Sequence, residues 1–166
     1  AKGEKTGWRT TSAAGRVLAP GSGVGGTGAI GVEGDGTNNC KWLSPPVKVR
    51  PSAVYGMSVQ VKADVKGGSL TMGTPAMNLT ESILNSRGNW VERKTVVFTS
   101  DNSAPYSETF RLGEYRVTGS MLFDNARVFP LKPVYENKNG LVLGHGERIA
   151  GRKYTFTTQW GREPRA

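Results

Sequence analysis

A strict alternation of side chains over residues 55–66 constrains the fold more than any other feature of the chain. Apolar or aromatic residues occupy the odd positions from Tyr55 onward, and glycine or polar residues occupy the even ones. Such a period of two predicts a β-strand that buries one face and exposes the other. The glycine pair at 67–68 then predicts a hairpin turn.

Short segments of the same kind, separated by turns, account for most of the remaining chain. The 166 residues include 23 glycines and nine prolines, and we expect nine to eleven strands and no helix. This pattern is typical of an all-β fold, a two-sheet antiparallel β-sandwich or jelly roll. We predict that residues 1–133 form this sandwich. Residues 134–166 are expected to form either an extra strand pair or the start of a neighbouring module.

The chain carries a net charge of +9, with 22 Lys and Arg residues against 13 Asp and Glu residues. Such a charge favours acidic partners, whether anionic polysaccharide, nucleic acid or an anionic surface. The basic residues form no polybasic run, so the alternative is a solvated basic surface. No segment approaches the roughly 18 apolar residues of a membrane span, and no signal peptide is visible. Cys40 is the only cysteine, which excludes an internal disulfide.

Residues that commonly carry catalysis are scarce. His145 is the only histidine, no G-x-S-x-G segment occurs, and no His or Cys cluster has metal-ligand spacing. Glutamates on or near predicted strands are the remaining candidates for a glycoside hydrolase: Glu33, Glu81, Glu92, Glu108 and Glu114. Hydrolysis needs two carboxyl groups that face each other about 5–10 Å apart, and nothing in the spacing selects a pair. We therefore predict a domain that is not an enzyme.

Side chains that suit a carbohydrate ligand are better represented. Flat aromatic rings stack on the C–H-rich faces of sugars, and two tyrosines stand beside polar neighbours, whereas the four tryptophans are more typical of a sandwich core. Basic residues on strands can meet carboxylate or sulfate groups, with arginine suited to bidentate contacts, or they can simply be solvated. The candidate ligand contacts are Lys41, Asn78, Arg93, Tyr106, Arg111, Tyr115 and Arg116.

One aspartate, Asp124, stands in a strand predicted over residues 120–130. The side of that strand on which it falls is otherwise apolar: Leu122, Ala126 and Val128. A buried carboxylate must be paired, hydrogen-bonded or bound to a metal. One hypothesis is a structural Ca²⁺ that Asp124 shares with backbone carbonyls of the glycine-rich loop at 20–28. The other is a carboxylate that accepts hydrogen bonds from backbone N–H groups or pairs with Arg16 or Arg127.

Four segments, in this order, carry a resemblance to a known family: Gly7-Trp8, residues 40–63, Asn89-Trp90 and Phe123-Asp124-Asn125-Ala126-Arg127-Val128. Together they resemble the jelly-roll carbohydrate-binding modules of the galactose-binding-like superfamily, the type appended to bacterial xylanases and other glycoside hydrolases. The resemblance covers roughly residues 7–133. The N-G-x-F-E strand that such modules have before the Gly-Trp is not found here, which predicts that the natural chain continues upstream.

The resemblance implies a secreted or cell-surface, non-catalytic module, joined covalently to neighbouring domains, that holds an enzyme on polysaccharide. It also implies a structural calcium ion, because Asp124 matches an aspartate of the family's final strand. We predict a polysaccharide ligand, an acidic one on grounds of charge, and neither nucleic acid nor membrane as a partner. Two alternatives stay open: a structural or assembly β-sandwich of a surface protein that binds no sugar, and a jelly-roll glycoside hydrolase or polysaccharide lyase.

Overall fold

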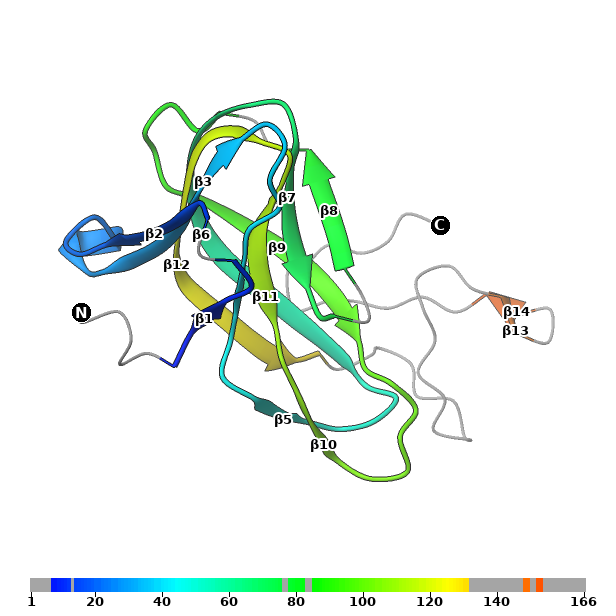
Figure 1. Cartoon of the computed structure of the whole chain (residues 1–166). Coiled ribbons are helices and arrows are strands. Elements are labelled where there is room, and N and C mark those ends of the chain that lie inside the picture. The colour runs from blue at the N-terminus through cyan, green and yellow to red at the C-terminus, as the bar shows by residue number, and fades with distance from the viewer. Residues whose placement is uncertain are drawn as a thin grey trace.

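Two five-stranded antiparallel sheets lie face to face in the computed structural model of the chain (Figure 1). The structure describes residues 7–12, 14–75, 78–82, 85–131, 148–149 and 152–153. The predicted all-β antiparallel sandwich is confirmed. Within these residues the helical structure is a single 3₁₀ turn, η2 (Val24–Gly26), in the glycine-rich loop. No helix in the described ranges is long and apolar enough to cross a membrane.

The first sheet, which we call the β4 sheet, has the strand order β1-β4-β11-β7-β8. Its strands are β1 (Arg9–Thr10), β4 (Lys41–Leu43), β11 (Arg111–Tyr115), β7 (Ser69–Gly73) and β8 (Asn78–Ser82). The second, the β6 sheet, has the order β2-β3-β12-β6-β9. Its strands are β2 (Arg16–Ala19), β3 (Ala29–Asp35), β12 (Thr118–Pro130), β6 (Val54–Lys66) and β9 (Val91–Phe98). A two-stranded ribbon, β5 (Val47–Val49) with β10 (Tyr106–Glu108), extends from one end (Figure 1).

The strand predicted from the alternation is β6, which lies between β12 and β9. Its odd-numbered side chains from Tyr55 to Val65 are all at most 8% exposed. Trp42 and Leu112 of the β4 sheet are buried in the same core, and the Trp42 Nε1–H donates to the Gly31 carbonyl of the β6 sheet at 2.7 Å. Burying one such apolar side chain stabilises a fold by about 1.5–3 kcal/mol, so this interior holds the two sheets together.

The alternation predicted along β12 is interrupted. The sequence predicted that one side of this strand carries a single set of residues: Leu122, Asp124, Ala126 and Val128. In the structure Phe123 is buried, and Val128 also packs against the core although its number is even. A bulge between Asp124 and Arg127 causes the change, because it adds a residue to β12 that β6 does not match. The predicted continuous alternation is therefore wrong, and Asp124 lies on the outer side of the sheet.

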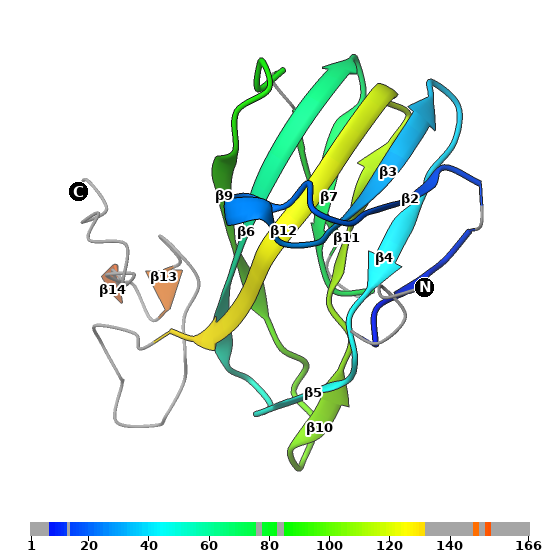
Figure 2. The same cartoon turned by 90° about the vertical axis from the view of Figure 1, so that its left-hand side faces the viewer.

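The glycine-rich loop, residues 20–28, crosses this outer side of the β6 sheet. Figure 2 shows η2 in front of β12 and β6, with the chain returning to the sheet through β3. The loop carries several glycines with positive φ, among them Gly25 and Gly26 at 67° and 81°. Glycine adopts positive φ with little energetic penalty because it has no Cβ, and this allows a tight turn here.

The described sandwich continues to Leu131, whose backbone N–H donates to the Val54 carbonyl at 2.9 Å. Further along, β13 (Arg148–Ile149) pairs with β14 (Arg152–Lys153) inside the segment where a strand pair was expected. The boundary predicted at residue 133 lies outside the described residues. The division into a sandwich and a second segment therefore stays a prediction.

Candidate functional site

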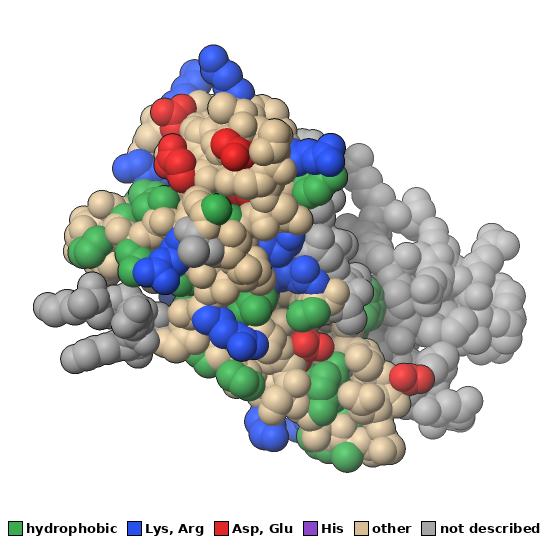
Figure 3. All heavy atoms as spheres, in the orientation of Figure 1, with side chains coloured by type: hydrophobic (Ala, Val, Ile, Leu, Met, Phe, Trp, Pro, Cys, Tyr) green, Lys and Arg blue, Asp and Glu red, His purple; other side chains and the backbone are tan. Residues whose placement is uncertain are grey.

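The outer side of the β4 sheet carries basic side chains and, among the described residues, no acidic ones. Because neighbours along a strand point to opposite sides, the buried Trp42 and Leu112 place Lys41 and Arg111 outward. We call this surface the basic face and define it by Arg9, Lys41, Leu43, Thr71, Arg111 and Tyr115. In the space-filling view, Lys and Arg side chains lie from the top of the molecule to its lower end, several of them across the middle, where Asp and Glu are sparse (Figure 3).

Five of the seven predicted ligand contacts lie on or beside the basic face. Lys41, Arg111 and Tyr115 belong to it. The Arg116 guanidinium lies over the Tyr115 ring, 5.1 Å from the ring centre. Asn78 occupies the β8 position in the same cross-strand row as Arg111. The sequence indicated these residues one at a time, and the fold brings their positions together.

The other two predicted contacts lie elsewhere. The Tyr106 hydroxyl accepts a hydrogen bond from the Ser100 backbone N–H at 3.0 Å and donates one to the Ser100 hydroxyl at 3.2 Å, which ties β10 to the preceding turn. Arg93 is in register with Val59, a core residue, so it lies on the inner side of the edge strand β9. The structure therefore does not bring Tyr106 or Arg93 to the basic face.

Two cations of the basic face are partly buried without an acidic partner. Lys41 is only 8% exposed and its Nζ contacts Asn39 Oδ1, while Arg111 Nε donates to the Thr74 carbonyl at 2.9 Å. Burial lowers the pKa of Lys41, and the nearby Arg111 charge lowers it further. Burial also lowers the pKa of Arg111, which the Glu108 carboxylate partly opposes. Within the described ranges neither cation forms an ion pair, and the nearby carboxylates of Glu114, beside Lys41, and Glu108, beside Arg111, only partly offset the positive charge.

A buried hydroxyl lies in the same cross-strand row as Lys41. Thr71 is in register with Gly113, and Gly113 is in register with Lys41. Thr71 Oγ1 is buried and has no hydrogen-bond partner in the part of the chain that the structure describes. A buried polar group without a partner costs about 1–3 kcal/mol, and because Thr71 is 0% exposed, this cost is a local destabilisation beneath the basic face. A Cβ at position 113 would lie 2.8 Å from Lys41 Cγ, which shows that the Lys41 stem crosses over β11 at this glycine.

Tyr115 adds an apolar surface to the basic face. Its side chain is 42% exposed, and it follows Arg111 by four residues, a distance of about 13 Å at the usual rise of a strand. The face can thus hold an anionic group at Lys41 and Arg111 and stack an apolar ring face on Tyr115. One extended oligomer could make both contacts.

Asp124 is held by hydrogen bonds from the glycine-rich loop. Its Oδ2 accepts from the Val24 backbone N–H at 2.7 Å and from the Thr27 hydroxyl at 2.9 Å, and its Oδ1 accepts from the Asn125 backbone N–H at 2.7 Å. Gly23 gives the loop room for this approach, because a Cβ there would lie 2.6 Å from Asp124 Oδ2. Of the two hypotheses that the sequence left open, the hydrogen-bonded carboxylate matches these contacts. The glycine-rich loop, which the calcium hypothesis named for its carbonyl oxygens, instead contributes N–H and O–H donors.

The same contacts bear on the predicted calcium ion. Ca²⁺ requires about six to eight oxygen ligands, whereas the loop directs N–H and O–H hydrogens at the Asp124 carboxylate. Across the described residues no group of three or more His, Cys, Asp or Glu side chains could hold a metal ion. The residues around Asp124 therefore do not fit a calcium cage, and calcium binding stays a prediction.

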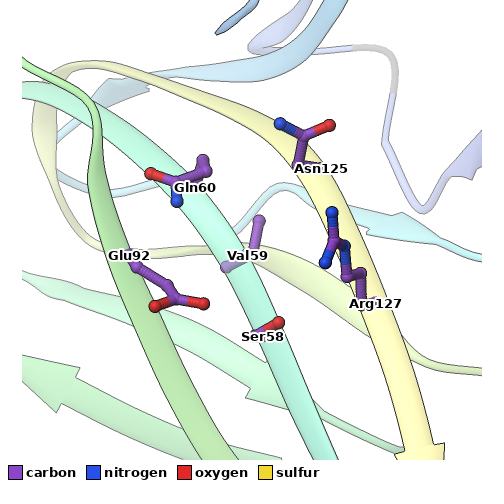
Figure 4. Close-up of a pocket in the computed structure, with 6 residues that line it drawn as sticks. All are labelled: Ser58, Val59, Gln60, Glu92, Asn125 and Arg127. Carbon is purple, nitrogen blue, oxygen red and sulfur yellow. The ribbon is translucent and has the colours of Figure 1, made fainter.

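A hollow lies on the outer side of the β6 sheet, beside the bulge of β12. Three neighbouring strands supply its lining, as Figure 4 shows: Glu92 from β9, Ser58, Val59 and Gln60 from β6, and Asn125 and Arg127 from β12. We call this hollow, whose volume is about 100 Å³, the bulge groove. Its residues were not among the predicted ligand contacts. The one sequence signal is the asparagine at 125, since Asn tolerates positive φ better than most residues.

Comparison with known proteins by sequence alone finds no matching family model and no matching curated protein. Comparison of structures does find similar folds. A family 16 carbohydrate-binding module superposes with a TM-score of 0.51 and 17% identity, over 74% of this chain and 90% of that one. A carbohydrate-binding module from Cellvibrio mixtus lichenase 5A, in complex with cellotriose, gives 0.53 and 20% identity, over 72% and 88% of the two chains.

A third structure holds the CBM22-1 and GH10 modules of Clostridium thermocellum endo-1,4-β-D-xylanase 10B, complexed with xylohexaose. It superposes with a TM-score of 0.54 and 15% identity over 75% of this chain, which corresponds to 26% of the xylanase chain. At these identities the likeness concerns architecture. The chain therefore has the jelly-roll β-sandwich fold of carbohydrate-binding modules, as the resemblance in its sequence implied.

Proposed function

We propose that the chain is a non-catalytic carbohydrate-binding module whose ligand lies across the basic face. The observation that carries this proposal is the convergence of Lys41, Arg111 and Tyr115 on one outer side of the sandwich. Aromatic and hydrogen-bonding side chains on a sheet can bind a sugar chain by stacking and by polar contacts at the same time. We further propose that the module is secreted or displayed at the cell surface and is joined to neighbouring domains.

The ligand class that fits the basic face best is an acidic polysaccharide. Lys41 and Arg111 are cations partly withdrawn from water, and no carboxylate on this face compensates them within the described ranges. A carboxylate or sulfate group would supply the missing charge and accept hydrogen bonds, with arginine suited to a bidentate contact. The net charge of +9 would also attract a polyanionic chain over longer distances.

The geometry of β11 supports binding without hydrolysis. Glu114, the carboxylate on this strand, is 0% exposed and points into the sandwich. Its Oε1 accepts from the Cys40 backbone N–H at 2.6 Å, and its Oε2 accepts from the Val117 backbone N–H at 3.2 Å. Both oxygens are therefore engaged in holding the backbone. A glycosidase would need two carboxyl groups that face a cleft.

Affinity electrophoresis in gels that contain polygalacturonate, alginate, xylan or soluble β-glucan tests the proposal. We expect retention in at least one acidic gel, and retention should weaken as salt is added because exposed charges are screened. The double substitution Lys41→Met with Arg111→Met should reduce affinity for that polysaccharide at least tenfold. Tyr115→Ala should weaken retention as well, by removing the stacking surface.

A matched control separates site binding from general attraction between charges. Lys66→Met removes one positive charge from the exposed side of β6, on the other sheet, and should leave retention nearly unchanged. Equal loss with Lys66→Met and with Lys41→Met would show non-specific attraction. Absence of retention in every gel would contradict the proposal and favour a structural β-sandwich.

A further inference from the structure

The bulge groove is a preformed hollow. Asp124 is in register with Gln60 and Arg127 with Ser58, so two residues of β12 stand opposite the single residue Val59 of β6. A bulge of this kind bends its strand and redirects the side chains that follow it. Figure 4 shows the result: Asn125 and Arg127 line one side of the hollow, with Gln60 and Ser58 beside them on β6.

The backbone of the bulge is strained and fixed in place. Asn125 has a φ of 50°, a conformation that costs a residue other than glycine of order 1 kcal/mol or more. The Asp124 carboxylate holds it there, since Oδ1 accepts from the Asn125 N–H while Oδ2 accepts from the glycine-rich loop. The loop therefore acts through Asp124 to position Asn125. A rigid support of this kind lowers the entropy lost when a ligand binds.

The polar side chains in the groove are available to a ligand. Within the described ranges, no hydrogen bond or ion pair engages the side chains of Ser58, Gln60, Asn125 and Arg127. Ser58 is nevertheless only 5% exposed, so its hydroxyl is accessible chiefly through the groove. Glu92, on the far side, forms an ion pair with Lys94 at 3.0 Å. The groove thus offers both hydrogen-bond donors and acceptors in a confined space.

The charges of the groove indicate what it binds. The lining holds one carboxylate, Glu92, which is paired with Lys94, and one guanidinium, Arg127, so neither sign of charge dominates the groove. Neighbouring hydroxyl groups of a neutral sugar both donate and accept hydrogen bonds, and they match two amides, a hydroxyl, a carboxylate and a guanidinium. We propose that the bulge groove is a second carbohydrate subsite, independent of the basic face, that binds the hydroxyl-bearing edge of a neutral sugar residue.

An aromatic ring, Phe129, lies next to the groove. Phe129 is in register with Gly56, one row along β6 from Ser58, and a Cβ at Gly56 would lie 2.3 Å from the Phe129 ring. The glycine lets the ring lie close against the strand, a known reason for glycine inside a sheet. The half-buried ring therefore adds apolar character to the outer side of the β6 sheet beside the groove.

Titrations monitored by NMR of the ¹⁵N-labelled full chain test this subsite. The probes are three neutral oligosaccharides, cellotriose, xylohexaose and β-1,4-galactotriose, with trigalacturonate as the acidic probe for the basic face. With at least one neutral probe, the side-chain amide signals of Gln60 and Asn125 should shift, with a Kd at or below about 10 mM. The substitution Asn125→Gly keeps the left-handed backbone and removes the amide, so it should weaken this binding at least tenfold. Arg127→Met should do the same without changing the backbone at residue 125.

The variants keep the two sites distinguishable. Lys41→Met with Arg111→Met should abolish the trigalacturonate response and leave the neutral response at Gln60 unchanged. Absence of shifts at Gln60 and Asn125 with all three neutral probes up to about 10 mM would overturn the second subsite. Shifts that both Asn125→Gly and Arg127→Met leave unchanged would overturn it too. Either result would leave the proposal for the basic face intact, which trigalacturonate tests separately.

Discussion

The two outer sides of the sandwich share one architecture and differ in how charge is arranged. On the β6 sheet acids accompany bases: Asp64 follows Lys62 on the outer side of β6, and Glu92 pairs with Lys94 at 3.0 Å. On the basic face the charged residues that the structure describes are all cations, and Lys41 among them is buried. Burying charge without a partner destabilises a fold. The difference therefore distinguishes a face that carries charges of both signs from one whose described charges are all positive.

The largest effect we expect concerns the strand that supports the basic face. Glu114→Ala removes a fully buried carboxylate and leaves the Cys40 and Val117 backbone N–H groups without acceptors. Two unsatisfied buried donors should lower the free energy of unfolding by about 3 kcal/mol, measured by urea denaturation. Glu114→Gln keeps one acceptor oxygen and should lose less. A loss below about 1 kcal/mol for Glu114→Ala would show that β11 does not depend on this carboxylate.

A second prediction concerns the glycine-rich loop, which crosses the outer side of the β6 sheet. Asp124→Asn keeps the shape of the side chain but places an amide NH₂ among three donors, and should lower the free energy of unfolding by about 1–2 kcal/mol. In wild-type protein, millimolar Ca²⁺ and EDTA should give the same Tm, because the carboxylate is already hydrogen-bonded. A rise in Tm with Ca²⁺ that Asp124→Asn abolishes would instead identify a calcium ligand.

The sequence was sufficient where one physical pattern dominates a segment. The alternation at 55–66 predicted β6 and its buried side, and glycine-rich turns with no helical period predicted the antiparallel sandwich. It also predicted Lys41, Arg111 and Tyr115 one by one, as strand residues suited to sugars and anions, and these three make up the proposed site. The sequence could not show that these residues lie on one face, because β4 and β11 are far apart in sequence and become neighbours only through strand pairing.

The sequence failed where the chain departs from regular periodicity. The bulge at Asn125 moves Val128 to the core side and creates the groove, and no Gly or Pro marks it in the segment 120–129. Residue type alone also failed to predict which way two candidate side chains point or what they bond to. Arg93 faces the inner side of an edge strand, and the hydroxyl of Tyr106 is engaged by a turn. Side-chain chemistry can be inferred from a sequence more readily than the direction in which the side chain points.

The third prediction tests whether the buried, charged Lys41 lowers the free energy of unfolding. A lysine whose pKa is lower in the folded chain binds its proton less tightly there than when unfolded. The folded state is therefore penalised while Lys41 is charged, and stability should rise as pH increases from the lowered pKa towards the ordinary value of about 10.4. Lys41→Met should remove this rise, which denaturation at a series of pH values measures. Lys66→Met, exposed on β6, should retain it, and a rise that persists in Lys41→Met would contradict the assignment.

The smallest effect should come from the charge-balanced side. Lys94→Met breaks the ion pair with Glu92, whose two side chains are 38% and 45% exposed, so water already screens the interaction. Exposed pairs of this kind contribute about 0.5 kcal/mol or less, and the free energy of unfolding should change within that limit. The difference between wild type and Lys94→Met should shrink further in high salt. A loss above about 1 kcal/mol would mean that the Glu92–Lys94 ion pair on the β6 sheet does stabilise the fold. The two faces would then differ less in how strongly their charges affect stability.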